Sequence, residues 1–201
     1  MPSEADRLLA ARRMCRDFLP DPLDADDVDA LTAAALGAPA AGNTWALDLL
    51  VLDGPDTARY WDTTLPAADR PSFPWPGLLR APLLVVPYVE AAAYVARYAK
   101  PDKARTGLGA AAEDWTVPYW WVDGGAAVMA MLVAAEGRGL GALFFGQFEH
   151  EPAVAAEFGV PAGRRALGTL AVGHPAGPGR PSRSARRGRP DPLDRVHRAH
   201  W

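Results

Sequence analysis

The segment from 119 to 137 constrains the fold most, because it reads as a single long helix that is apolar almost all round. A helix that packs only one side on a core keeps a polar face, whereas a helix without one is buried on most sides. Its uncharged part, 124–135, is shorter than the roughly 18 apolar residues of a membrane span. The segment therefore predicts the central core helix of a soluble domain, and no membrane is expected as a partner.

The rest of the chain supplies strands and helices to surround such a helix. Short apolar runs bounded by turn residues are typical of buried strands, and they occur at 47–53, at 82–89, within 139–146 and at 167–173. Helical spacing of apolar residues, capping residues and prolines predict helices at 4–18, 25–36, 55–64 and 90–99. The irregular alternation of the two kinds of element favours an α+β fold, in which helices cover a sheet, over a regular βαβ array. A chain of 201 residues has the size of one domain.

Composition indicates a folded protein of a reducing compartment. Apolar residues make up 49% and charged residues 22% of the chain, close to the averages of globular proteins. The single cysteine, Cys15, cannot form a disulfide within the chain. Charged residues occur throughout positions 1–18, so the apolar segment of a signal peptide is missing there. We therefore expect a cytoplasmic protein.

Charge is distributed unevenly along the chain. Residues 1–175 contain 14 Lys and Arg against 22 Asp and Glu, whereas residues 176–201 contain seven Arg against two Asp. Arg12, Arg13 and Arg16 fall within about one turn of the expected first helix. Guanidinium groups bind phosphate through planar, bidentate hydrogen bonds, so this cluster and the one in the tail predict a phosphate site if they converge. Solvated faces or partner-binding patches are the alternatives.

Nucleic acid is not expected as a partner of these arginines. The body of the chain is acidic, and the basic tail lacks the interleaved aromatic residues on which bases stack. A small ligand or another protein chain is therefore the better interpretation of the basic tail.

The sequence contains no complete set of catalytic side chains. Its serines lie outside the G-x-S-x-G context of a nucleophile elbow. His197 and His200 have no cysteine pair or H-E-x-x-H motif to complete a metal site. The glycines of 107–109 and 137–141 are not placed between a strand and a helix, as a phosphate-binding loop requires. We therefore expect neither a catalytic side chain nor a metal.

Four motifs, taken in order, resemble those of FMN-dependent nitroreductases. Residues 12–18, R-R-M-C-R-D-F, resemble the R-R-S-x-R-x-F opening of that family, and residues 38–44, A-P-A-A-G-N-T, resemble its A-P-S-x-x-N-S loop. Residues 139–146, G-L-G-A-L-F-F-G, resemble the glycine-containing segment after the family's central helix, and residues 187–190, R-G-R-P, resemble its basic C-terminal motif. Each motif alone is weak, but the ordered set is fairly specific and spans essentially the whole chain.

The resemblance implies a nitroreductase-like fold, with a central mixed or antiparallel sheet flanked by helices and two chains intertwined in a homodimer. Residues 1–201 would form a single domain, whose basic C-terminal arm, 176–201, completes the flavin site and the dimer. The implied activity is that of an oxidoreductase that takes hydride from NADH or NADPH onto FMN and then reduces a small-molecule substrate by a ping-pong mechanism. Nitroaromatics, quinones and activated enones are the implied acceptors.

The resemblance also assigns particular residues to the cofactor. The residues implied at the FMN phosphate are Arg12, Arg13, Met14, Arg187 and Arg189. Arg16 would reach the ribityl chain or the incoming nicotinamide nucleotide. The residues implied to line the isoalloxazine ring and ribityl chain from the partner subunit are Pro39, Ala40, Ala41 and Asn43. Backbone N–H groups at Phe145 and Gly146 would face the flavin N5 and O4 atoms, where such donors stabilise negative charge on the reduced ring.

Some positions depart from the family pattern. Met14 stands where the family has a serine, and its loop serines and the following glutamine are replaced by Ala40, Ala41 and Trp45. Side-chain hydrogen bonds to the cofactor are lost at these positions, at a cost of about 1 kcal/mol each. A degenerate member of the fold, which binds flavin weakly or not at all and acts as a binding or interaction protein, is therefore an alternative to the enzyme.

Aromatic residues between positions 93 and 125 are a further distinctive feature. The stretches 93–107 and 115–125 resemble an actinobacterial-style branch of the family. Trp115 and Trp120 in this region, together with Trp45, are candidates for a substrate pocket. Packing in the core or at a dimer interface is the alternative role for side chains of this size.

Overall fold

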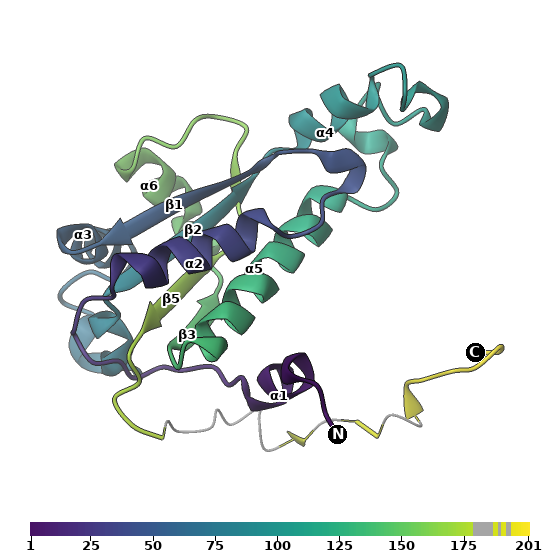
Figure 1. The fold of residues 1–201 in the computed structure, drawn as a ribbon. Coiled ribbons are helices and arrows are strands. Elements are labelled where there is room, and N and C mark those ends of the chain that lie inside the picture. The colour runs from purple at the N-terminus through teal and green to yellow at the C-terminus, as the bar shows by residue number, and fades with distance from the viewer. Residues whose placement is uncertain (179–186, 189, 192–193) are drawn as a thin grey trace.

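A long apolar helix, α5 (Tyr119–Gly137), lies across one face of an antiparallel sheet, as Figure 1 shows. The computed structural model describes residues 1–178, 187–188, 190–191 and 194–201. The buried residues of α5 are Gly124, Ala127, Val128, Met131, Leu132 and Ala135. Within the described ranges no helix, α5 included, is long and apolar enough to cross a membrane. The predicted helix over 119–137 is confirmed, but within this chain only one side of it is buried, and Tyr119, Trp121 and Val122 are exposed.

The sheet has four main strands in the order β1, β2, β5, β3, and all neighbouring strands are antiparallel. Their bounds are Leu47–Asp53 for β1, Leu83–Val89 for β2, Gly141–Phe145 for β3 and Thr169–Gly173 for β5, and a short strand β4 (Arg165–Ala166) also pairs with β2. All residues of β2 and β5 are buried, as expected for central strands. The four predicted strands are therefore confirmed, and β1 and β3 form the edges of the sheet.

Helices cover both faces of the sheet. On one face, α2 (Ala25–Leu36) packs with α5 on the sheet. On the other face, α3 (Pro55–Thr64) and α6 (Glu151–Glu157) pack on the sheet. Successive residues of a strand point to opposite faces, so β2 contributes side chains to both clusters. The bounds of α2 and α3 agree with the predicted ones, whereas α6 has no counterpart among the predicted helices.

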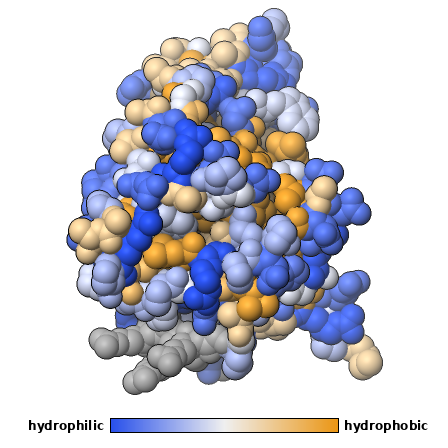
Figure 2. Space-filling view, turned by 90° about the vertical axis from the view of Figure 1, so that its left-hand side faces the viewer, coloured by the Kyte–Doolittle hydropathy of each residue, from blue (hydrophilic) through white to orange (hydrophobic). Residues whose placement is uncertain are grey.

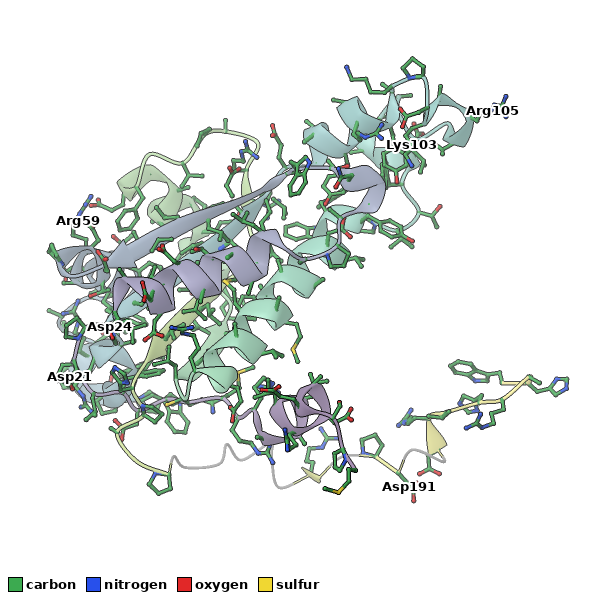
Figure 3. The ribbon with its side chains drawn as sticks, in the orientation of Figure 1. Asp21, Asp24, Arg59, Lys103, Arg105 and Asp191 are labelled. Atoms are coloured by element: carbon green, nitrogen blue, oxygen red, sulfur yellow. The ribbon has the colours of Figure 1, made fainter. Side chains whose placement is uncertain are left out.

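Charged side chains connect α3 and α6 at the outer surface. Arg59 of α3, labelled in Figure 3, forms an ion pair of 2.8 Å with Glu157 of α6. Figure 2 views the molecule from this side and shows hydrophilic residues spread among hydrophobic ones. Such a mixed surface is typical of a face exposed to solvent.

Between β2 and α5 the chain forms an excursion, residues 91–118, which begins with α4 (Ala91–Tyr98). Figure 1 shows that it projects beyond the sheet, and Figure 3 labels Lys103 and Arg105 near its outer end. Its small core consists of Ala46, Tyr94 and Trp115, with Tyr98, Leu108 and Trp120 among the residues packed against it. The helix expected at 90–99 is confirmed as α4. Single 3-10 turns occur at Ala41–Asn43, Arg70–Ser72, Pro76–Arg80, Ala104–Thr106, Ala112–Asp114 and Phe148–His150.

The N-terminal helix is shorter than its sequence pattern predicts. Helix α1 spans Glu4–Ala11, and the chain leaves helical geometry at Arg12, where φ is −47° and ψ is 126°. The Cys15 N–H donates to the Ala142 carbonyl at 2.9 Å, and Met14 pairs with Ala142 in parallel. This pairing with the edge of β3 satisfies backbone groups outside a helix, so a tertiary contact overrides the helical periodicity. The prediction that the N-terminal arginines share one helical turn is therefore wrong.

The basic C-terminal arm, expected over 176–201, is described only in part. Residues 179–186, 189 and 192–193 lie outside the described residues. The described residues from 187 onward are exposed, and Figure 1 shows the C-terminus well separated from the sheet. The role of the arm in a flavin site and a dimer stays a prediction.

Candidate functional site

Arg12 lies where α1 ends, two residues before Met14, an exposed residue that pairs with the start of β3. The Nε and Nη1 atoms of Arg12 are buried and have no hydrogen-bond partner in the described chain. Leaving buried charged donors unpaired is costly, and a planar guanidinium group is suited to bidentate binding of an anion. Arg12 therefore fits the phosphate-binding role that the sequence motif implies.

Arg13 and Arg16 contact other parts of the protein. The Nη1 atom of Arg13 donates to the carbonyl oxygens of Ala10 at 2.6 Å and of Arg12 at 2.9 Å, and so caps the end of α1. A cation is favoured there because the last carbonyl groups of a helix carry partial negative charge. The guanidinium carbon of Arg16 lies 5.1 Å from the centre of the Trp75 ring, in a cation–π geometry. Among the described residues, Arg12 is the one of these three arginines whose buried nitrogen atoms have no hydrogen-bond partner.

The far end of β3 carries Phe145 and Gly146. The Phe145 ring stacks on the Trp61 ring with centroids 5.9 Å apart, so its side chain joins the cluster beneath α3. Gly146 is exposed, and a Cβ atom at this position would lie 2.9 Å from Cζ of Phe148. The Phe148 ring therefore lies close against the glycine, although 81% of this residue is exposed. The sequence motifs do not single out Phe148.

A buried polar network holds the loop that follows β3. Gln147 is 5% exposed, and its Nε2 atom donates to Oγ1 of Thr169 at 3.0 Å. The hydroxyl groups of Thr169 and Tyr60 form a second hydrogen bond of 2.7 Å. Burial raises the pKa of Tyr60, so its hydroxyl group stays protonated. The network joins the loop to β5 and α3 and fixes the backbone next to Gly146.

The segment 39–44 is a tight loop between α2 and β1. Gly42 and Asn43 both have positive φ angles, of 66° and 55°. A Cβ atom at Gly42 would lie 2.7 Å from Cε2 of Tyr98, so only glycine fits at this position. The Tyr98 ring thus covers the turn from the side of α4.

Two side chains from other elements hold this loop. The Ala41 N–H donates to Oδ2 of Asp123 on α5 at 2.6 Å. The Nε atom of Arg97 on α4 donates to the Gly42 carbonyl at 2.7 Å. Arg97 and Asp123 lie within the stretches 93–107 and 115–125, but the sequence does not indicate their contacts with the loop, because their partners lie far away in the chain.

The loop borders a cavity of about 50 Å³ between α2 and α5. Its lining includes Pro39, Ala40, Asn43, Trp45, Tyr94 and Asp123. Trp45 is 77% exposed, which is unusual for so large an apolar side chain. Of the loop residues implied by the motifs, the structure therefore brings together Pro39, Ala40 and Asn43 around one cavity, with Trp45 beside them.

Trp115 and Trp120 differ from Trp45 in their surroundings. Trp115 is 6% exposed, and its indole N–H donates to the Leu108 carbonyl at 2.9 Å. The Trp120 ring packs on Trp115 and Tyr94, with centroids 5.9 Å and 6.0 Å apart. Both tryptophans therefore pack inside the excursion, and Trp45 is the exposed one of the three candidates for a substrate pocket.

The predicted cofactor residues lie at the two ends of α5. The loop is bonded to Asp123 near one end, whereas α1 packs at the other end, where Leu8 lies next to Gly137. Asp123 and Gly137 are 14 positions apart, about 21 Å along a helix that rises about 1.5 Å per residue. Figure 1 shows α1 and α4 at these opposite ends. Within one chain, Arg12 therefore lies near β3 and far from the loop 39–44.

Two of the implied phosphate ligands belong to the C-terminal arm. Arg187 is described and exposed, whereas Arg189 lies outside the described residues. Their convergence with Arg12 stays a prediction. Within the part of the chain that the structure describes, no group of three or more side chains is arranged to hold a metal ion.

Comparisons with known proteins match this architecture. The profile of the nitroreductase family matches residues 9–174. Nitroreductase CinD from Lactococcus lactis, solved in complex with nicotinic acid, is 19% identical, with 96% of this chain and 98% of that chain covered and a TM-score of 0.77. The same enzyme in complex with 4-nitrophenol is 20% identical at the same coverage, with a TM-score of 0.75. A nitroreductase family protein from Clostridium difficile is 17% identical over 100% of both chains, with a TM-score of 0.69.

A comparison with curated proteins gave no match. The solved structures are distant in sequence and therefore show a shared fold. The family profile adds evidence from the sequence itself. It covers the first three of the four motifs and extends from α1 to the end of β5. The predicted α+β, nitroreductase-like fold is thus confirmed, and the chain belongs to the nitroreductase family.

Proposed function

We propose that this protein is an FMN-dependent oxidoreductase that uses NADH or NADPH to reduce nitroaromatic, quinone or enone-type acceptors by ping-pong hydride transfer. Membership of the nitroreductase family supports an oxidoreductase of this type. The observation that carries the proposal is Arg12, whose buried Nε and Nη1 atoms have no partner in the described chain and are suited to an anionic one. FMN, when bound, supplies the hydride-accepting and hydride-donating chemistry, so no catalytic side chain is needed.

The phosphate end of the proposed site lies at the start of β3. Arg12 binds the phosphate there, and the sequence motif implies Arg187 and Arg189 of the arm as further phosphate ligands. Arg13 is fixed at the end of α1 through Nη1, which leaves its other guanidinium N–H groups available to the phosphate. Arg16, oriented by the Trp75 ring, reaches the ribityl chain or the nicotinamide nucleotide. Met14 offers its backbone but no hydroxyl group.

The part of the proposed site that would hold the isoalloxazine ring lies where β3 ends, at Phe145 and Gly146. Backbone N–H groups at Phe145 and Gly146 would hold the ring of bound FMN here and would stabilise negative charge on it. The buried hydrogen bond between Gln147 and Thr169 holds this backbone in one conformation before the ligand binds. The residues that line the ring from the partner subunit are Pro39, Ala40, Ala41 and Asn43.

Two copies of the chain are needed to complete such a site. In one chain the loop lies at the opposite end of α5 from Arg12, so it serves the phosphate and ring sites of a second copy. An open apolar hollow between α1, α2 and α5, lined by Leu8, Leu9, Met129 and Val133 among others, is a suitable contact surface for that copy. Burial of apolar surface of this kind drives association. We therefore infer a homodimer in which the arm 176–201 packs on the partner.

The acceptor is proposed to bind beside Trp45. An indole ring that is 77% exposed offers an apolar face on which a planar acceptor can stack. Trp115 and Trp120 pack in the small cluster that contains Ala46, the residue next to Trp45. CinD has been solved with nicotinic acid and with 4-nitrophenol, which supports a small aromatic acceptor here as well.

The visible absorption spectrum of the purified protein tests the proposal. The protein is mixed with FMN, free flavin is removed, and NADH or NADPH is added without oxygen. We expect retained flavin absorbance that bleaches with one of the two nucleotides. Protein that stays colourless after this treatment contradicts the proposal.

A matched pair of variants tests the role of Arg12. Arg12→Gln is expected to weaken FMN binding by about tenfold or more, because a charged hydrogen-bond donor is lost. Arg7→Gln removes the same charge from an exposed position on α1 and is expected to leave FMN binding unchanged. Equal affinities for the two variants contradict the assignment.

A degenerate family member without flavin chemistry is the second candidate. It is favoured by Met14, Ala40 and Ala41, which provide no hydroxyl groups to a cofactor. Oxidation of NADH or NADPH in the presence of a panel of quinones and nitro compounds separates the two candidates. Sustained turnover excludes the degenerate member, whereas absence of both turnover and flavin retention favours it.

A further inference from the structure

Asp123 joins two segments that are far apart in the sequence. Its Oδ2 atom accepts a hydrogen bond of 2.6 Å from the Ala41 N–H and one of 2.8 Å from the Tyr94 hydroxyl. Ala41 belongs to the loop 39–44, Tyr94 belongs to α4, and Asp123 itself belongs to α5. One carboxylate oxygen therefore sets the position of the loop relative to the excursion.

Tyr94 is a permanent donor to this carboxylate. It is 2% exposed, and its ring packs on the Trp115 ring with centroids 5.9 Å apart. Burial, reinforced by the hydrogen bond to Asp123, raises the pKa of Tyr94 far above its ordinary value. Hydrogen bonds to an ionised acceptor are stronger than those between neutral groups. The contact between α4 and α5 is thus fixed, and the loop is attached to a rigid point.

Arg97 holds the same loop from α4. Its Nε atom donates to the Gly42 carbonyl, and its two terminal nitrogens bind the carboxylate of Asp102 at 2.9 Å and 2.7 Å. Within the described residues, Asp123 and Arg97 supply the hydrogen bonds that connect positions 40–44 to other elements. The remaining hydrogen bonds of the loop are local.

The loop depends on such external bonds for its shape. Gly42 and Asn43 are both in the left-handed region, which glycine and asparagine adopt more readily than other residues but only as single residues, so two in succession need support from outside the turn. Ala40 and Ala41 carry no polar side chain, so this part of the loop binds a ligand through backbone groups and methyl groups alone. Backbone contacts require the backbone itself to be in place, and a displacement of about 1 Å can cost about a hundredfold in function.

We propose that Asp123 is a positioning residue of the flavin site, which holds Ala41 and its neighbours in the geometry that contacts the flavin ring. The inference rests on the proposed function, because it takes the loop 39–43 as part of an FMN site. In this proposal Asp123 acts through its hydrogen bond to the Ala41 N–H. Where the family motif implies loop serines that reach the cofactor, this chain has Ala40 and Ala41 and a carboxylate behind the loop.

The test compares three variants in α5. Asp123→Ala removes both hydrogen bonds, Asp123→Asn keeps an oxygen acceptor without the charge, and Glu136→Ala removes the other carboxylate of the same helix as a matched control. Two quantities are measured: the hydrogen-exchange rates of the amides at 40–44 in flavin-free protein, and the dissociation constant for FMN. The first readout is independent of the cofactor.

We expect Asp123→Ala to accelerate exchange of the Ala41 amide and to weaken FMN binding, each by about tenfold. Asp123→Asn should show smaller changes in the same direction, because a neutral oxygen accepts weaker hydrogen bonds than a carboxylate does. Glu136→Ala should match the wild type in both. This ranking distinguishes a positioned loop from a general loss of stability in α5.

The outcomes separate the inference from the proposed function. Wild-type protein that binds no FMN overturns the proposed function and the inference with it. Wild-type protein that binds FMN, together with an Asp123→Ala variant that matches it in exchange or in affinity, overturns the inference alone. If Asp123→Ala does not fold, Asp123→Asn is compared with Glu136→Ala in the same two measurements, and equality of these two variants overturns the inference.

Discussion

Met14 pairs in parallel with Ala142, so the N-terminal segment of the chain runs along the edge of β3. This register places Arg12 beside the beginning of the strand and leaves Gly146 at its far end. Gly146 is four residues beyond Ala142, about 13 Å at about 3.3 Å per residue. Both ends of the proposed cofactor site therefore belong to one edge strand, whose backbone sets the distance between them.

Trp45→Ala tests the proposed acceptor site. Because this residue is 77% exposed, its truncation should leave the free energy of unfolding within about 0.5 kcal/mol of the wild type. The KM for a nitroaromatic acceptor is expected to rise by about tenfold through loss of stacking, while FMN affinity stays unchanged. Steady-state kinetics and flavin titration check this, and Leu36→Ala, another exposed apolar residue that lines the same cavity, is the control. A KM that responds equally to both variants argues against a specific role for Trp45.

Thr169→Val tests the buried polar network next to Gly146. The variant keeps the shape of the side chain but leaves the Tyr60 hydroxyl and Nε2 of Gln147 without a partner. We expect the free energy of unfolding to fall by about 2–4 kcal/mol, measured by urea denaturation. Thr32→Val, on α2, removes a hydroxyl group that bonds only to carbonyls of its own helix and should cost less than about 1 kcal/mol. Similar losses for the two variants would contradict the assignment of a stabilising role to the hydrogen bonds of Thr169.

Phe148→Gly and Phe148→Ala together test the backbone conformation after β3. Both variants lack the ring, so their difference reports the positive φ of 50° at this position. Phe148→Gly should be more stable than Phe148→Ala by about 1 kcal/mol, because only glycine adopts this conformation without strain. Glu149 has no positive φ, so Glu149→Ala should be more stable than Glu149→Gly. Urea denaturation measures the free energy of unfolding of the four variants. If the alanine variant is the more stable one at both positions, the assignment of strain to Phe148 is contradicted.

Glu151→Gln tests a pH-dependent contact between α6 and β4. The Oε1 atom of Glu151 accepts hydrogen bonds of 2.9 Å from Nε of Arg165 and from the Ala166 N–H. The bond to Arg165 lowers the pKa of Glu151 in the folded protein. Because the folded pKa lies below the unfolded one, the stabilisation is present at neutral pH and is lost as the pH falls through the folded pKa.

The expected size of this effect is small, because Arg165 is largely exposed and solvent screens the pair. Glu151→Gln should lower the free energy of unfolding by about 0.5–1 kcal/mol at neutral pH, and by less in acid. Urea denaturation at several pH values measures it. Glu113→Gln, at an exposed carboxylate with no hydrogen bond within the described chain, is the control and should leave the free energy of unfolding at neutral pH unchanged. A loss at Glu151 that is constant over the pH range would contradict the mechanism.

The longer elements could be predicted because their signals are local. The bounds of β1, α2, α3 and α5 follow the apolar periodicity and the turn residues that delimit it. The segment after Ala11 could not be predicted, because its extended form depends on Ala142, 128 positions after Met14. Local helical spacing there carries no information about a distant edge strand.

The candidate site shows the same division. Arg12 and the loop could be located from motifs of adjacent residues. Asp123 could not, because its partner Ala41 lies 82 positions away and a single aspartate in a helix has no distinctive pattern. Phe148 could not either, since a left-handed backbone at phenylalanine is set by its surroundings rather than by its side chain.

Under the proposed function, the Nε and Nη1 atoms of Arg12, which have no hydrogen-bond partner within the described residues, have a consequence for the lifetime of the protein in a cell. Buried donors without a partner lower the free energy of unfolding of the ligand-free chain, and an anion that pairs with them restores it by mass action. The fraction of chains open to proteases therefore falls as the ligand becomes available. The abundance of the protein is thus expected to follow the supply of its anionic ligand, even at a constant rate of synthesis.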